Sequence, residues 1–74
     1  MPRPGHSYRM QSATLAIINL EGQNHPTTVP SGAIVRVIDG PLDGNRLVDV
    51  AWNGKTVMMF TTDIRDRGVW LEDV

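Results

Sequence analysis

The run from Arg46 to Phe60 constrains the fold of this chain most, because it has the pattern of a β-hairpin. Two mostly apolar segments, Leu47–Trp52 and Thr56–Phe60, flank the tripeptide Asn53-Gly54-Lys55. Asn-Gly is the strongest short-range hairpin signal, because a type I′ turn needs φ > 0 at both central residues, and Asn and Gly tolerate that region. The segment therefore predicts two antiparallel strands joined by a two-residue turn.

The turn also predicts which side chains share a face of the hairpin. On one face we expect the cross-strand pairs Trp52–Lys55, Val50–Val57 and Val48–Met59. On the other face we expect Leu47, Asp49 and Ala51 against Thr56, Met58 and Phe60. Both faces are largely apolar, whereas a half-buried hairpin alternates apolar and polar residues. Either the hairpin bends across a tight barrel, or a partner subunit covers its second face. The expected core consists of Val35, Val37, Val48, Val50, Val57 and Met59, with Ile17 or Ile18.

Turns rich in Gly and Pro divide the chain into five short β-rich segments, which indicates an all-β domain. The expected strands are Thr14–Leu20, Ala33–Asp39, Arg46–Trp52, Lys55–Phe60 and Val69–Glu72. Thr61–Asp66 predicts a single helical turn before the last strand, with Thr61 or Thr62 as its cap. Five strands with a helical turn in that place resemble a five-stranded SH3-like barrel.

Two other segments have the composition of irregular structure. Met1–Gln11 contains two prolines, a glycine and few apolar residues. We therefore expect a flexible N-terminal tail over residues 1–11 and a barrel domain over residues 12–74. Glu21–Pro26 is a polar cluster that favours a turn, and Thr27–Val29 adds a few extended residues after it.

Length and composition restrict the classes of function. The 74 residues suffice for one domain, carry a net charge of −1 and include no cysteine, which excludes disulfides and thiolate metal sites. The lack of cysteine suits the cytoplasm, and the apolar run Ala13–Leu20 is too short to span a membrane. Neither His6 nor His25 has a ligand-spaced partner, and no nucleophile elbow or phosphate loop occurs. We therefore predict no cofactor, metal or catalytic residue.

The candidate binding residues are basic side chains and one tryptophan. They are Arg36, Arg46, Trp52, Lys55, Arg65 and Arg67. Interleaved basic and aromatic residues are the ingredients of single-strand nucleic-acid binding. Acidic residues interleave just as densely, so the alternative interpretation is a mixed, solvated surface.

The segment Gly32–Gly44 resembles the KOW motif of ribosomal proteins and bacterial transcription-elongation factors. That motif runs G-x-x-V-x-V, then two residues, then G-P-[FL]-x-G, and it matches here at Gly32, Val35, Val37, Gly40, Pro41, Leu42 and Gly44. KOW motifs lie inside SH3-like barrels, and the resemblance implies contact with RNA, the ribosome or RNA polymerase. Turn chemistry alone also produces Gly-Pro-x-x-Gly, because Pro presets φ and Gly supplies φ > 0.

Two classes of function follow from these observations. The first is a non-catalytic binding module that recognises a protein or a nucleic acid, or assembles with itself. The second is a small enzyme whose site forms at the symmetry axis of an oligomer, because a 74-residue chain has little room for a pocket of its own. We expect the binding module, and we expect a homodimer or larger assembly, because apolar residues lie on both faces of the hairpin.

Overall fold

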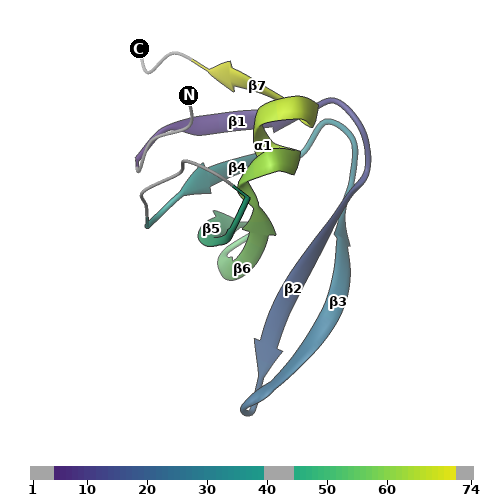
Figure 1. The fold of residues 1–74 in the computed structure, drawn as a ribbon, viewed down its shortest axis with the longest axis vertical. Helices are drawn as coiled ribbons and strands as arrows, with labels where there is room; N and C mark the ends of the chain where they lie inside the picture. The colour runs from purple at the N-terminus through teal and green to yellow at the C-terminus, as the bar shows by residue number, and fades with distance from the viewer. Residues whose placement is uncertain (1–4, 40–44, 72–74) are drawn as a thin grey trace.

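One antiparallel sheet of seven strands and one short helix form the fold of the computed structural model, which describes residues 5–39 and 45–71 (Figure 1). In chain order the elements are β1 (Ser7–Met10), β2 (Thr14–Leu20), β3 (Gln23–Val29), β4 (Ile34–Val37), β5 (Leu47–Trp52), β6 (Lys55–Phe60), α1 (Thr61–Arg67) and β7 (Gly68–Leu71). The order across the sheet is β3-β2-β6-β5-β4-β1-β7. In Figure 1, β1, β4 and β7 run across the view while β2 and β3 run down it, so the sheet is strongly twisted.

The all-β class is confirmed, but the five-stranded barrel is not. The sheet contains two strands that the sequence did not predict, β1 and β3. It also remains open within the described residues, because β3 and β7 are its two edges and do not pair with each other.

The hairpin of β5 and β6 is confirmed in its predicted register. The strands pair as Trp52↔Lys55, Val50↔Val57 and Val48↔Met59, with Leu47↔Phe60, Asp49↔Met58 and Ala51↔Thr56 on the other face. Asn53 and Gly54 have φ angles of 54° and 75°, the positive values that a type I′ turn requires. The local turn chemistry therefore sets the register of the two central strands.

The flexible tail predicted for residues 1–11 is wrong for Ser7–Met10, which form β1 between β4 and β7. Tyr8 and Met10 alternate with the polar Ser7 and Arg9, and both apolar side chains are buried. Alternation over only four residues is a weak signal for a strand, and the residues before it are rich in Pro and Gly. The first four residues of the predicted tail lie outside the described part of the chain.

The polar turn predicted for Glu21–Pro26 is also wrong beyond its first two residues. Glu21 and Gly22, with φ of 53° and 82°, form the tip of a hairpin whose second strand is β3. β3 pairs with β2 along its whole length, and this hairpin extends away from the rest of the sheet (Figure 1). Most of β3 is exposed, so its polar side chains carried no apolar pattern that would reveal a strand.

The helix lies where the sequence predicts a helical turn, but it has seven residues and a different cap. Its N-cap is Phe60, and no side chain caps it. Thr61 is buried, and its hydroxyl oxygen instead accepts a hydrogen bond from the backbone N–H of Arg46, at 3.2 Å. The side chain expected to cap the helix therefore ties the helix to the start of β5. Gly68 ends the helix, with its N–H bonded to the carbonyl of Ile64.

The core lies between the inner face of the sheet and α1. Its buried apolar residues are Tyr8, Met10, Ala16, Val29, Val35, Val37, Val48, Val50, Val57, Met59 and Ile64. All six core residues predicted in β4, β5 and β6 are among them. Of the two candidates in β2, Ile18 packs against the core, whereas Ile17 lies opposite Met58 on the other face.

Candidate functional site

The face of the sheet that points away from the core carries a set of apolar side chains. Successive residues of a strand point to opposite faces, so the residues that alternate with the buried valines in β4 and β5 face outward. These apolar side chains, together with Ala51 and two charged residues that lie between them, make up what we call the outer face. It consists of Leu15, Ile17, Ile34, Arg36, Ile38, Leu47, Asp49, Ala51, Met58 and Phe60. Four of its large apolar residues are 40–56% exposed: Leu15, Ile34, Ile38 and Leu47.

Strand pairing brings the members of the outer face next to one another. Leu47 lies opposite Phe60, and Met58 lies between Asp49 on β5 and Ile17 on β2. Asp49 is half-buried in this apolar setting. Within residues 5–39 and 45–71 its carboxylate has no ion-pair or hydrogen-bond partner. A carboxylate held among apolar side chains without a partner is costly, so its surroundings favour an added donor.

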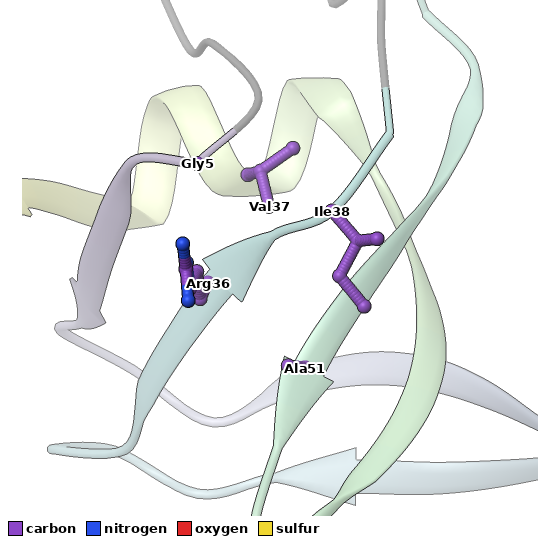
Figure 2. Close-up of a pocket in the computed structure, with 5 residues that line it drawn as sticks. All are labelled: Gly5, Arg36, Val37, Ile38 and Ala51. Carbon is purple, nitrogen blue, oxygen red and sulfur yellow. The ribbon is translucent and has the colours of Figure 1, made fainter.

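A shallow hollow opens on the sheet at the end of β4 (Figure 2). Its volume is about 280 Å³, and it is lined by Gly5, Arg36, Val37, Ile38 and Ala51. Figure 2 shows Arg36, Ile38 and Ala51 around it, from β4, its continuation and β5. Gly5 reaches the hollow because its backbone N–H donates to the carbonyl of Val37 at 2.6 Å.

The structure brings two of the sequence-predicted binding residues together. The ammonium group of Lys55 lies 5.4 Å from the ring centroid of Trp52, within the range of a cation–π interaction. Both residues belong to the tip of the β5–β6 hairpin, where they form the pair next to the turn. Trp52 also packs against the core, so one side of its ring has a structural role.

The other four predicted binding residues lie elsewhere. Arg36 belongs to the outer face, and Arg46 precedes β5, six residues and therefore about 20 Å of strand from Trp52. Arg65 and Arg67 are exposed on α1, where Arg67 pairs with Asp63 at 3.7 Å. The six residues therefore do not form one continuous basic surface.

The described residues include no cluster of side chains that could hold a metal ion. No group of three His, Cys, Asp or Glu side chains gathers within residues 5–39 and 45–71. His6 stacks on Trp70 instead, with ring centroids 5.2 Å apart, and His25 lies exposed in β3. No helix in the described ranges is long and apolar enough to cross a membrane.

Sequence reasoning found only part of the outer face. It predicted that Met58 and Phe60 lie on an apolar second face, and their pairing with β5 confirms their placement. It missed Ile34, Ile38 and Leu15 as exposed members of the same face. Their signal was present, because the run Ile34–Ile38 has large side chains at both alternating sets of positions, which a strand buried on one face does not need.

The evidence for the function of this chain is its own geometry, because comparisons with known proteins do not add to it. No protein-family model matches the sequence, and neither curated proteins nor solved structures give a match. The first part of the KOW-like segment has structural roles: Gly32 turns the chain with φ of 87°, and Val35 and Val37 are core residues. Its second part, Gly40–Gly44, lies outside the described residues.

Proposed function

We propose that this protein is a non-catalytic binding module that contacts its partner through the outer face. The observation that carries the proposal is the outer face itself, with four large apolar side chains 40–56% exposed around a half-buried carboxylate. Single exposed apolar residues are normal on a small protein, but a contiguous apolar surface usually marks an interaction site. The central Asp49 adds specificity, because a partner without a matching donor leaves the carboxylate unpaired.

The proposal includes the fold: we regard the twisted sheet as an open relative of the SH3-like barrel. The long central hairpin β5–β6 and the short helix between β6 and β7 support this view. In such a scaffold the core lies inside the bend of the sheet, so the convex side is free to carry recognition residues. Contact through the outer face then requires no rearrangement of the core.

Affinity capture with a matched pair of variants tests the proposal. Ile38 and Leu20 are 49% and 51% exposed, but only Ile38 belongs to the outer face. We expect Ile38→Glu to lose the proteins retained by the immobilised wild-type chain, including a differently tagged copy of the chain, whereas Leu20→Glu retains them. Equal behaviour of the two variants contradicts the proposal.

A second candidate function is contact with RNA or an RNA-bound machine, as the KOW-like segment implies. The observation that favours it is the position of Lys55 over the ring of Trp52, since neighbouring aromatic and basic groups bind unpaired bases. The scatter of the other basic residues and the net charge of −1 weigh against it. Nuclease treatment before capture separates the two candidates, because loss of the retained proteins after digestion favours RNA and survival favours a direct protein contact.

A further inference from the structure

Two opposite charges lie unpaired on the outer face, and one of them, Arg36, lines the hollow. Arg36 is exposed on β4 and Asp49 is half-buried on β5. Neither side chain has an ion pair or side-chain hydrogen bond with the rest of the described chain. Both groups therefore remain available for a partner of complementary charge.

Strand pairing determines how these charges are arranged. Arg36 lies opposite Ala51, and one step further along the strands the N–H of Ile38 donates to the carbonyl of Asp49 at 2.9 Å. The four residues therefore form the corners of a patch, with Arg36 and Asp49 on one diagonal and Ile38 and Ala51 on the other. A two-fold axis along the diagonal from Ile38 to Ala51 exchanges the positions of the two charges.

We infer that a second copy of this chain covers the outer face and is related to the first by this axis. Asp49 then pairs with the partner's Arg36, and Arg36 pairs with the partner's Asp49, because a two-fold interface uses the same patch on both copies. This inference rests on the proposed function, and it identifies the partner of the outer face as a second copy of the chain. Two reciprocal ion pairs within an apolar surface set the register of the interface as well as its attraction.

The apolar side chains around the charges fit the same arrangement. Ile38 lines the hollow (Figure 2), so the two Ile38 side chains, which meet near the axis, would each lie at the rim of the other copy's hollow. The volume of that hollow is about 280 Å³, slightly smaller than the roughly 300–1,000 Å³ of a typical small-molecule pocket. A hollow of this size can accept an inserted side chain. Met58, which lies next to Asp49 on β6, approaches the partner's Ile34.

The free edge of β3 is a poorer place for a second copy to attach. Glu21-Gly22 is a two-residue turn, so Leu20 and Gln23 form its hydrogen-bonded closing pair, and pairs alternate from there along the hairpin. Pro26, three residues on, is opposite Ile17 in a pair that does not exchange hydrogen bonds, so its nitrogen points outward to the edge. Proline has no N–H to donate there, which blocks the extension of the sheet through β3.

Charge-reversal variants test this inference by mass. The wild-type chain should give twice the 8.2 kDa mass of one copy in light scattering at high micromolar concentration. Asp49→Arg places two arginines opposite each other at each contact and Arg36→Asp places two acids, so each variant alone should give the single-copy mass. A mixture of the two variants contains two complementary contacts per heterodimer, so the doubled mass should return.

Rescue by mixing cannot arise from an interaction within one chain, which is why it is the decisive result. The charge-removing variants Asp49→Asn and Arg36→Gln provide a graded control. Each variant alone lacks both ion pairs and should weaken association, whereas their mixture keeps one Arg36–Asp49 pair per heterodimer and should restore association only in part. Leu20→Glu should keep the doubled mass. Circular dichroism of each variant checks that it retains its sheet.

Three results overturn the inference: a single-copy wild-type mass, charge-reversed variants that still dimerise alone, or a mixture that stays monomeric. The affinity-capture experiment distinguishes failure of this inference from failure of the proposed function. If self-pairing fails while Ile38→Glu still loses other retained proteins, the outer face binds a different protein. If Ile38→Glu and Leu20→Glu behave alike in capture, the proposed function itself is wrong.

Discussion

Two glycines at the ends of neighbouring elements are required for different physical reasons. Gly54 has φ of 75° with no atom within 4 Å of the position that a Cβ would take, so its backbone conformation is the constraint. Gly68 has an ordinary φ of −106°, but a Cβ there would lie 2.5 Å from the carbonyl oxygen of Ile64. The first glycine allows the hairpin turn, and the second allows α1 to pass directly into β7.

We expect Gly54→Val to lower the free energy of unfolding by more than about 1 kcal/mol, because a β-branched residue strongly opposes positive φ. Gly54→Asn should cost less, since Asn tolerates the left-handed region. Thermal melting of the two variants measures the difference. A melting temperature that is unchanged in Gly54→Val would mean that the turn does not set the hairpin register.

At the scale of the element, strands were predictable from sequence where apolar residues and turn chemistry agree. β2 and β6 have the bounds that the sequence predicts, and the Asn53-Gly54 turn aligns β5 with β6 residue by residue. β1 and β3 were missed, because one is short and follows a lead rich in Pro and Gly, while the other is an exposed edge strand. Their pairing is a tertiary effect: β2 supplies the template for β3, and β4 and β7 hold β1.

The outer face, too, was only partly predictable from the sequence. Apolar residues on both faces of β5 and β6 are visible in the sequence, but it does not reveal which strands lie beside them. Ile38 joins Asp49 only because β4 pairs with β5, across a loop that separates them in sequence. Such long-range neighbours follow from the whole fold rather than from local pattern.

Neighbouring substitutions in β5 test the assignment of its two faces. Val50 is completely buried, so Val50→Ala should lower the free energy of unfolding by roughly 1–3 kcal/mol, from lost burial and a residual cavity. Asp49→Ala should cost little or stabilise the monomer, because it removes a half-buried carboxylate without a partner. Urea unfolding at low protein concentration compares both variants as monomers. Greater sensitivity at Asp49 would mean that the two faces are assigned backwards.

At the scale of the whole molecule, stability depends on segments from both ends of the chain. A chain of 74 residues is near the size at which one core suffices. Here β1 lies between β4 and β7, and it adds Tyr8 and Met10 to the core. The N–H of Gln11 donates to the carbonyl of Arg67, at 2.7 Å, which ties the end of β1 to the end of α1. The first strand therefore links the C-terminal segment to the centre of the sheet.

Truncation before Ser12 should therefore abolish cooperative folding, although the sequence alone places the start of the domain there. The truncated chain loses two buried side chains worth about 1.5–3 kcal/mol each, against a total stability of about 5–15 kcal/mol for a typical domain. It also loses every backbone bond of β1 and leaves β4 and β7 without their shared neighbour. A chain that begins at Gly5 keeps these interactions and serves as the matched control. Thermal unfolding followed by circular dichroism distinguishes the two, and a sharp transition in the chain that begins at Ser12 would show that β1 is dispensable and that the domain does begin at residue 12.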